Sequence, residues 1–498
     1  MGYNSSDKKE LSETIVVIGA GITGLATAWR LSTKGFKVIV LERQNFPGGL
    51  ATSIIDNGFK MDIGPHFLTL PKNSPITNDV KKLIGVKNLI EIKKIHESYR
   101  VYFRGELLKK YPTLYDIIFK SGVSTFIHSI WDYFIVKITP QQLKNHNSSI
   151  ENYLISTYGK FLYNYWFKPY IVQNEGIGDP QQPKELIEKM FPPPTFKKIL
   201  NYILKNSSRT SSTKKQVEIE PSSEYFDCYF RDGMGSIIEN MLKDIKNNGG
   251  EILLGVDIQT IIHDDKTKKI HFFKDGKGHE IESKIIIYSV PPSIILKWFD
   301  NIPENISAKN QKYEAFHSII AFLMIDAPKV FDGWLIQVYD TDLIFFRITQ
   351  QNFLSDNVSP PEKSLLCVEV KCTENDYIWT IDESEIFSRI KSDLEKTKIL
   401  TNKKIFNYKI IKLNNIYPIA QQTVNLNNNE IIKFINSFKN EYAVTTSTID
   451  SGRLVSGTKE ESDANNIPRL GGLYLALYNS KILTSEILED NKSRLIGG

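Results

Sequence analysis

Cysteine is scarce in this sequence: only Cys228, Cys367 and Cys372 occur among 498 residues, and no two of them form a CxxC pair. This scarcity excludes a small secreted scaffold stapled by disulfides, and it excludes a zinc site of the usual cysteine spacing. We therefore expect a protein of a reducing compartment, with no structural metal.

Long hydrophobic runs are also missing. The nearest to one, residues 126–138, carries His128, Asp132 and Lys137 and stays short of the roughly 18 to 20 apolar residues that cross a bilayer. Residues 1–13 are polar and lack the order of charged, apolar and small residues that marks a signal peptide. We expect a cytoplasmic protein, and the sequence leaves membrane association through peripheral contact open.

Charge of one sign is not in excess, because 62 Lys and Arg residues face 57 Asp and Glu residues for a net charge of +5. This balance gives no support for a nucleic-acid partner. Hydrophobic residues make up 41% and charged residues 24%, which is typical of a folded globular protein. A chain of 498 residues is long enough for more than one domain, and nothing in it determines the oligomeric state.

A glycine-rich turn opens the readable part of the chain. The apolar run 15–18 is followed by Gly19, Gly21 and Gly24 in GxGxxG spacing, and residues 25–31 then repeat apolar residues at helical spacing. In such a strand–turn–helix unit the first glycine permits the turn, the second lets the backbone approach a pyrophosphate, and the third lets the helix pack closely. The helix N-terminus favours an anion. The pattern therefore predicts a dinucleotide site.

An acidic residue completes the unit. A second apolar run, 36–41, ends in Glu42, close to the roughly 20 residues past the glycines at which such units bind ribose hydroxyls. Its carboxylate would repel a 2'-phosphate, which argues against NADP. The residues alone thus leave FAD and NAD as the candidates.

Further motifs resemble the flavin amine oxidase superfamily. They are Gly48-Gly49 soon after the acidic residue, and the stretch from Gly58-Phe59 to Asp62-Ile-Gly64-Pro-His66. The branch of protoporphyrinogen oxidase-like, phytoene desaturase-like and UDP-galactopyranose mutase-like proteins is the most similar. The resemblance implies noncovalent FAD, with cofactor contacts from Gly19, Ala20, Gly21, Ile22, Thr23, Gly24, Glu42, Arg43, Gly48, Gly49, Leu50, Ala51, Gly64, Pro65, His66, Phe67, Ile258, Gly472, Leu473 and Tyr474.

The resemblance extends along most of the chain. Residues 229–236 resemble a segment that returns to the cofactor domain, 249–261 the strand that brackets adenine at Ile258, and 284–292 a strand ending in a proline turn beside the cofactor. It implies an α/β fold: a Rossmann-like, GR2-type FAD-binding domain from 1–70, 226–300 and 440–498, with an inserted α+β substrate domain from 71–225 and 301–439. The apolar–polar alternation within 318–370 predicts an antiparallel sheet in that substrate domain.

Departures from the family pattern accompany these matches. Leu50 stands where the family usually has Arg, Gln173 and Glu175 replace a Lys and a Trp, and the stretch 445–472 lacks the usual approach to the last helix. They keep a degenerate flavin-binding protein among the hypotheses. The aromatic residues of 161–170 lie at helical spacing, which favours a role in the core over a substrate platform.

Candidate catalytic residues are few. His66 could contact the flavin or move a proton, and we favour a positioning role. Arg347 and Arg231 could bind an anionic substrate, since a guanidinium suits a carboxylate or diphosphate, although a surface position or an ion pair explains them at least as well.

The leading functional hypothesis is an FAD-dependent oxidoreductase. It would remove hydride equivalents from a small hydrophobic or cyclic substrate and pass them to oxygen or a quinone-like acceptor. The alternative is a redox-neutral enzyme like UDP-galactopyranose mutase.

Overall fold

A computed structural model gives the fold of the chain. It describes residues 14–93, 95–108, 123–138, 149–174, 177–188, 190–193, 224–264, 267–309, 315–418, 422–444 and 472–496. Residues 205–215, whose Ser, Thr, Lys and Arg content predicts a surface loop, lie outside this range. Residues 445–471, which precede the last helix, and Glu175 lie outside it as well. No helix of the described residues is long and apolar enough to cross a membrane.

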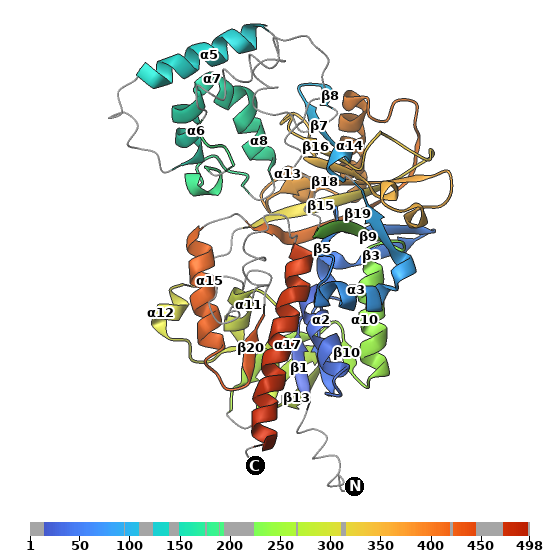
Figure 1. Ribbon diagram of the computed structural model, residues 1–498, viewed down its shortest axis with the longest axis vertical. Coiled ribbons are helices and arrows are strands. Elements are labelled where there is room, and N and C mark those ends of the chain that lie inside the picture. The colour runs from blue at the N-terminus through green and yellow to red at the C-terminus, as the bar shows by residue number, and fades with distance from the viewer. Residues whose placement is uncertain are drawn as a thin grey trace.

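A five-stranded parallel sheet forms the centre of the lower part of the molecule (Figure 1). Its strand order is β10-β2-β1-β14-β20, from β10 (Glu251–Leu253), β2 (Val38–Leu41), β1 (Ile15–Ile18), β14 (Ile285–Tyr288) and β20 (Glu441–Ala443). The strands are short and almost wholly apolar, as strands of a parallel sheet covered on both faces must be. The strands expected from 15–18, 36–41 and 284–290 are thus neighbours in one sheet.

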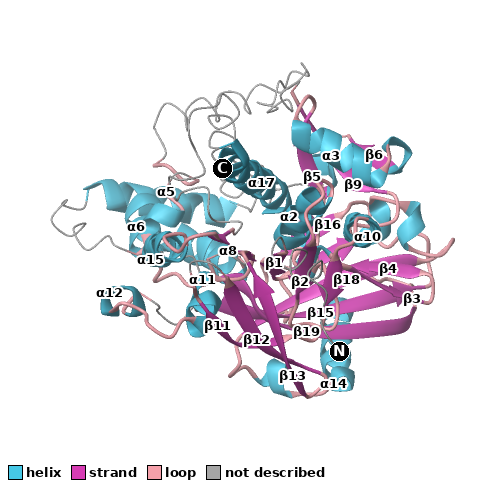
Figure 2. Cartoon of the chain, turned by 90° about the horizontal axis from the view of Figure 1, so that it is seen from below, coloured by secondary structure: helices cyan, strands magenta, loops and turns pink. Residues whose placement is uncertain are grey.

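Alternate side chains of these strands enter two different cores. Ile15 and Val17 pack with α2 (Ile22–Ser32), α10 (Gly235–Asn247) and α17 (Gly472–Ile496). Val16 and Ile18 face the opposite way, toward α15 (Gln422–Ile435) and the strands within residues 257–283. Figure 2 shows β1 and β2 between these two layers. The smaller helices α11 (Pro292–Ile295) and α12 (Glu304–Ser307) and the turn η7 (Leu296–Trp298) complete the second core.

The stretch 249–261, expected as one strand, is two. β10 belongs to the parallel sheet, whereas β11 (Asp257–Ile262) begins an antiparallel sheet with β12 (Lys268–Lys274) and β13 (Lys277–Ser283). Gly255 lies between the two strands with a φ of +68°. Glycine adopts this left-handed conformation easily, and a residue in it interrupts a strand. At the other end of this sheet Asp275 and Gly276 both have positive φ and join β12 to β13 in a tight hairpin.

A seven-stranded sheet occupies the upper part of the molecule (Figure 1). Its order is β19-β15-β18-β17-β16-β7-β8, from β19 (Ile405–Pro418), β15 (Ala315–Ile325), β18 (Ser364–Cys372), β17 (Arg347–Gln350), β16 (Leu335–Val338), β7 (Tyr99–Phe103) and β8 (Glu106–Leu108). Neighbours are antiparallel except for β16 and β7. The expected sheet within 318–370 is therefore present, and the sheet is wider because β7, β8 and β19 extend it.

The two faces of this sheet join it to different neighbours. Ile319, Ala321 and Leu323 pack against α14 (Glu383–Thr397), which Asp382 caps through the N–H groups of Ser384 and Glu385. Ile320, Phe322 and Met324 pack instead against Phe59 and Met61 of β4. Because β4 (Phe59–Asp62) ends two residues before Gly64, this second face brings the seven-stranded sheet to the expected cofactor site.

Two small sheets and the helix α3 (Pro75–Ile84) lie between the large sheets. β3 (Ser53–Asp56) and β4 (Phe59–Asp62) form a hairpin whose turn, Asn57-Gly58, has positive φ at both residues. β5 (Leu68–Pro71) and β6 (Leu89–Ile92) both pair with β9 (Tyr225–Phe230). The turns η1 (Gly49–Ala51), η2 (Val86–Asn88) and η3 (Ile95–Ser98) complete this region.

Helices of the first insertion form the uppermost part in Figure 1: α5 (Val123–Ile138), α6 (Ile150–Tyr158), α7 (Lys160–Leu162), the π-helical turn η5 (Tyr163–Phe167) and α8 (Lys168–Gln173). Tyr163, Trp166 and Phe167 are buried in their core, as helical spacing predicts. The remaining short elements are η6 (Lys184–Leu186), η8 (Gln351–Phe353), η9 (Asp356–Val358) and α13 (Tyr377–Thr380).

Candidate functional site

The glycine turn between β1 and α2 is tightly packed on one side. Gly19 has a φ of +103°, and a Cβ there would lie 2.7 Å from the carbonyl oxygen of Ser289. A Cβ on Gly24 would lie 2.0 Å from the carbonyl oxygen of Gly19. Glycine is therefore required at both positions by the fold itself, which explains two of the three glycines of the motif.

Gly21 differs from both, because its φ is −68° and a Cβ there would meet no atom within 4 Å. It is the N-cap of α2 and provides no side-chain cap, and the first turn of the helix carries no acidic residue. The first N–H groups of an α-helix have no partner within the helix. This open space at a helix N-terminus is where a phosphate group fits.

The second glycine pair lies directly beside the first turn. Gly48 forms a parallel bridge with Gly21 and donates its N–H to the carbonyl oxygen of Ala20 at 2.7 Å. A Cβ on Gly49 would lie 3.4 Å from the Cα of Gly21. Two backbone segments without side chains thus border one space. Leu50 is 41% exposed and Ala51 is buried, so the residue that replaces the family arginine points an apolar side chain toward the surface.

Glu42 lies at the end of β2 and organises this turn. Its Oε2 accepts a hydrogen bond from the N–H of Ala20 at 2.7 Å, and its Oε1 accepts one from the N–H of Gln44 at 2.8 Å. A carboxylate has about four acceptor sites. Two of those on Glu42 are used by these backbone N–H groups, which leaves about two for ribose hydroxyls. The neighbouring Arg43 is exposed.

Ile258 lies close to Glu42 because Gly255 and Val256 donate their N–H groups to the carbonyl oxygens of Gln44 and Glu42. The Ile258 carbonyl oxygen accepts a hydrogen bond from the indole of Trp298 at 3.1 Å. The adenine-side residue expected from the sequence is therefore at the same edge of the parallel sheet as the glycine turns.

The segment Gly64 to Phe67 connects β4 to β5 at the junction of the two large sheets. Gly64 has a φ of +90°, and a Cβ there would lie 3.7 Å from Oε2 of Glu369 and from Cε1 of His66. The buried Nδ1 of His66 has no hydrogen-bond partner among the described residues. Burial lowers the pKa of His66, against the opposing effect of Asp62 and Glu369. The segment thus holds a neutral imidazole with one unsatisfied nitrogen.

Arg347 and Glu369 form a buried ion pair next to this segment. Nε of Arg347 donates to Oε1 of Glu369 at 2.6 Å, and Nη2 donates to Oε2 at 2.8 Å. Tyr417 donates its hydroxyl hydrogen to Glu369 Oε2 at 2.6 Å. The charge of Arg347 is therefore compensated inside the protein. Of the two roles considered for this arginine, the structure shows the ion pair.

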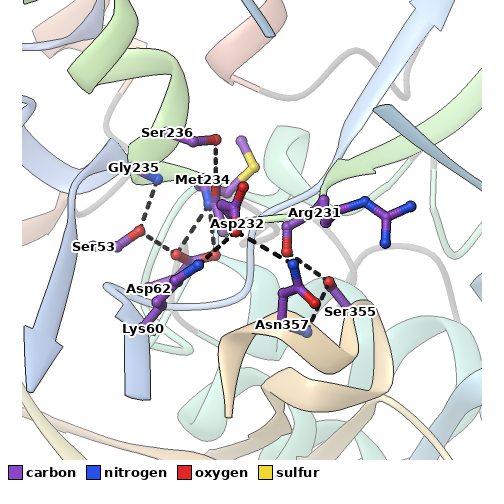
Figure 3. Close-up of polar contacts among 11 residues, drawn as sticks. Ser53, Lys60, Asp62, Arg231, Asp232, Met234, Gly235, Ser236, Ser355 and Asn357 are labelled. Carbon is purple, nitrogen blue, oxygen red and sulfur yellow. Dashed lines mark hydrogen bonds and ion pairs between the residues drawn. The ribbon is translucent and has the colours of Figure 1, made fainter. Parts of the chain in front are cut away.

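Asp62, at the end of β4, is hydrogen-bonded to the start of α10 (Figure 3). Its carboxylate accepts hydrogen bonds from the Ser53 hydroxyl, from the Met234 N–H at 3.1 Å and from the Tyr229 hydroxyl. The backbone of Asp62 is bound by the amide of Gln351 through both its N–H and its C=O, at 3.1 and 2.7 Å. Burial raises the pKa of Asp62, while these donors oppose the rise. Strands β4 and β9, helix α10 and the turn η8 are thus fastened at one point.

Arg231, the second arginine considered for anion binding, lies at the rim of this network. Its side chain is exposed and points away from Asp62 in Figure 3, while its carbonyl oxygen accepts a hydrogen bond from Ser355 at 2.6 Å. Next to it, Asp232 accepts a hydrogen bond from Lys60 at 2.5 Å.

The first turn of α17 contains the last residues expected at the cofactor, Gly472, Leu473 and Tyr474. The helix packs against α2, α3 and β5, and Arg30 of α2 donates a hydrogen bond to Ser480. Since β5 directly follows Phe67, α17 passes beside the His66 segment, and its first turn lies at the level where the two large sheets meet (Figure 1). Tyr474 is buried and stacks on Tyr478.

The three cysteines are all buried as free thiols. Burial raises the pKa of Cys228 and of Cys372 to about 12. A thiol must ionise to act as a nucleophile, so these residues are poorly suited to tether a cofactor.

These residues fit a flavin dinucleotide. Gly21 and the Gly48-Gly49 pair leave space for a pyrophosphate at the start of α2, Glu42 retains acceptor sites, and the unsatisfied Nδ1 of His66 is available at the junction. No group of three or more His, Cys, Asp or Glu side chains in the described ranges could hold a metal ion.

Sequence reasoning missed Glu369, Tyr417 and Gln351. A signal for the first was present, because Glu369 lies within the apolar run 365–370 and Arg347 follows Phe345 and Phe346, and opposite charges are stable in a core only when paired. Gln351 had no such signal, since a glutamine that binds backbone groups looks the same in sequence as an exposed one.

Comparisons with known proteins agree with this geometry. The family model of flavin-containing amine oxidoreductases matches residues 22–404. Phytoene desaturase from Fusarium fujikuroi is 35% identical over 95 residues, which cover 19% of this chain and 16% of that protein. The 4,4'-diapophytoene desaturase of Staphylococcus aureus (strain MRSA252) is 26% identical over 288 residues, or 56% of each chain. The chain thus aligns with about half the length of the latter relative.

Two solved structures share the fold over nearly the whole chain. A reduced UDP-galactopyranose mutase has a TM-score of 0.70 at 16% identity and covers 96% of this chain and 94% of its own. A putative protoporphyrinogen oxidase from Exiguobacterium sp. 255-15 has a TM-score of 0.64 at 15% identity and covers 96% and 98%. The branch resemblance inferred from the motifs is therefore confirmed at the level of a mixed α/β fold. The chain belongs to the family of flavin-containing amine oxidoreductases, with FAD as its cofactor.

Proposed function

We propose that this protein is an FAD-dependent oxidoreductase that removes hydride equivalents from a small hydrophobic or cyclic substrate and passes them to oxygen or a quinone-like acceptor. The observation that carries the proposal is the pairing of Gly21 with Gly48 and Gly49 at the start of α2, next to the junction that holds His66. The curated relatives named above are desaturases of phytoene and 4,4'-diapophytoene, which supports a hydrophobic substrate.

We further propose the finer architecture. Residues 1–70, 226–300 and 440–498 would form a Rossmann-like, GR2-type FAD-binding domain, and 71–225 with 301–439 an inserted α+β substrate domain. The parallel sheet and the seven-stranded sheet support this division. α3 packs against α10, so part of the first insertion would cover the cofactor domain. The free, buried cysteines support a cytoplasmic location.

Each group at the site would have one task. The N–H groups at the start of α2 and around Gly49 would bind the pyrophosphate, and Glu42 would accept the ribose hydroxyls. The flavin supplies hydride acceptance when bound. His66, kept neutral by burial, would hold the ring in place through Nδ1. The first turn of α17, Gly472 to Tyr474, would direct its N–H groups at the pyrimidine edge.

The mutase alternative needs cationic groups for a sugar diphosphate. Arg347 donates two hydrogen bonds to the carboxylate of Glu369, and the side chain of Arg231 is exposed. Neither arrangement favours a diphosphate next to the flavin, so the oxidoreductase is the better supported function. A degenerate flavin-binding protein would retain FAD and lack turnover.

Spectroscopy of the purified protein tests the proposal. We expect the absorption bands of oxidised flavin, and FAD by mass in the fraction released by heat. Anaerobic mixing with phytoene, 4,4'-diapophytoene or protoporphyrinogen in detergent should bleach these bands with one substrate, and air should restore them. If turnover of UDP-galactopyranose appears only after chemical reduction, the protein is a mutase. Bound FAD that none of the substrates bleaches would support the degenerate protein.

A further inference from the structure

The sequence contains two Asn-Gly pairs. Asn57-Gly58 is the turn of the β3–β4 hairpin, and Asn248-Gly249 directly follows α10. All four residues are exposed. Asparagine is a thermolabile residue, and a glycine after it has no Cβ to shield the next backbone nitrogen from the asparagine side chain. The sequence alone therefore makes both pairs candidates for spontaneous deamidation.

Hydrogen bonding distinguishes the two pairs. The N–H of Gly249 donates to the carbonyl oxygen of Lys246 at 3.0 Å. The N–H of Gly58, in contrast, donates no hydrogen bond to any residue that the structure describes. Deamidation begins with an attack by this glycine nitrogen, which must first leave any acceptor that it binds. The helix end thus protects Asn248, and the hairpin turn leaves Asn57 open to attack.

The turn at Asn57 also lies at the tip of a short hairpin. The ladder of β3 and β4 has only the four pairs from Ser53–Asp62 to Asp56–Phe59, and β3 has no fully buried residue. Segments with so few buried contacts open locally at little cost in free energy. Opening lets Asn57 leave its left-handed conformation, with a φ of +47°, and turn its side-chain amide toward the nitrogen of Gly58.

The reaction is a ring closure followed by hydrolysis. The nitrogen of Gly58 bonds to Cγ of Asn57, the side-chain nitrogen leaves as ammonia, and a cyclic imide forms. Water then adds to one of the two imide carbonyls and opens the ring. The product is an aspartate or an isoaspartate, and in the isoaspartate the main chain runs through the former side chain and is longer by one carbon.

An isoaspartate at this turn would act on the cofactor junction through β4. The turn of a two-residue hairpin sets the register of its strands, and a longer main chain at residue 57 does not fit that turn. β4 carries Met61, which packs against the seven-stranded sheet, and Asp62, whose carboxylate binds the Met234 N–H (Figure 3). A displaced β4 would therefore disturb the segment that begins at Gly64.

We propose that Asn57 is a site of spontaneous deamidation, and that the isoaspartate formed there weakens FAD binding as the protein ages. The modification itself needs only water and is independent of the proposed function. Its effect on FAD rests on the proposed cofactor site.

Peptide mapping of the full-length, FAD-loaded protein tests the modification. The protein is incubated at mildly alkaline pH and digested at intervals. Trypsin releases residues 44–60 and 247–266, so tandem mass spectrometry follows Asn57 and Asn248 in one digest. We expect Asn57 to react at least about fivefold faster, the factor that one backbone hydrogen bond of typical net strength gives. Equal rates, or a slower reaction at Asn57, would overturn the proposal.

Two variants test the effect on FAD. Asn57→Gly removes the reacting side chain, and glycine keeps the positive φ of the turn. Asn248→Gly is the matched control. We expect the wild type and the control to release FAD as isoaspartate accumulates, and Asn57→Gly to retain it. Release of FAD from Asn57→Gly at the rate of the wild type would overturn the effect on the cofactor. A fresh protein that binds no FAD would contradict the proposed function, and the peptide rates would still decide the modification.

Discussion

The guanidinium of Arg347 and the carboxylate of Glu369 form a two-pronged ion pair between directly opposed residues of β17 and β18. Both side chains are buried, with 9% and 0% exposed. Breaking such a pair leaves one charge uncompensated in the core. The pair lies next to Gly64, so its integrity bears on the shape of the cofactor junction.

Replacement of Glu369 by Gln should therefore destabilise the protein by about 3–5 kcal/mol. The double variant Arg347→Met/Glu369→Leu should lose less than the single one, because no charge is left buried. Urea unfolding measures both. Lys363→Met is the control, since it removes the exposed pair with Asp326 and should cost only about 0–1 kcal/mol. An unchanged unfolding midpoint in Glu369→Gln would contradict this account of the pair.

Substitution of the glycines in the first turn should distinguish residues needed for the stability of the fold from residues needed for FAD binding. Gly21→Ala adds a methyl group in open space at an unstrained φ, so the protein without FAD should keep its stability while its affinity for FAD falls. Gly24→Ala forces a contact with Gly19 and should lower the stability of the protein without FAD as well. Thermal unfolding and FAD titration of the two variants check this difference. Equal FAD affinity in Gly21→Ala and the wild type would place the pyrophosphate elsewhere.

Asp62 should make stability fall as the pH rises. Burial raises the pKa of Asp62, whereas the unfolded carboxyl ionises near about 3.9. Between these two values the folded state holds a proton that the unfolded state releases, so this contribution to stability is present in acid and is lost as the pH rises to the raised pKa. The free energy of unfolding of the wild type should therefore exceed that of Asp62→Asn by most in acid, and this difference should shrink as the pH rises to the raised pKa.

Asp232 provides the opposite slope as a control. Its hydrogen bond with Lys60 lowers the pKa of Asp232, so its contribution is present above about pH 3.9 and is lost as the pH falls through the lowered value. Urea unfolding of Asp232→Asn across the same pH range should show a difference from the wild type that grows with pH. Parallel slopes for Asp62→Asn and Asp232→Asn would refute the assignment of the two environments.

His66 should make the protein less stable as the pH falls into the mildly acidic range. Burial lowers the pKa of His66, and the unfolded imidazole titrates near about 6.5. The unfolded state therefore binds a proton first, so stability is lost as the pH falls from about 6.5 toward the lowered value. His66→Gln removes this slope. Thermal unfolding of the FAD-free protein from neutral to acidic pH measures it, and an identical slope in the variant would show that His66 does not titrate in this window.

Local rules determined several elements of this protein from the sequence alone. The glycine turn at 19–24 and the strand before it follow from apolar runs and from the space that only glycine leaves. The apolar–polar alternation in 318–370 likewise predicted strands that are present. These features are short in range, because each depends on residues within one strand, one turn or one helix.

Contacts between distant segments were decided only by the tertiary structure. β7 and β8 extend a sheet built mostly from residues 315–418, and Gln351 binds the backbone of Asp62 from 289 residues away. The family pattern joined 249–261 into one strand, whereas pairing with two different sheets divides it at Gly255. The same holds for α5, whose amphipathic pattern is readable in sequence while the exposure of its Ile127 and Trp131 is not. Periodicity indicates that a helix has two faces, and only packing determines which of them is buried.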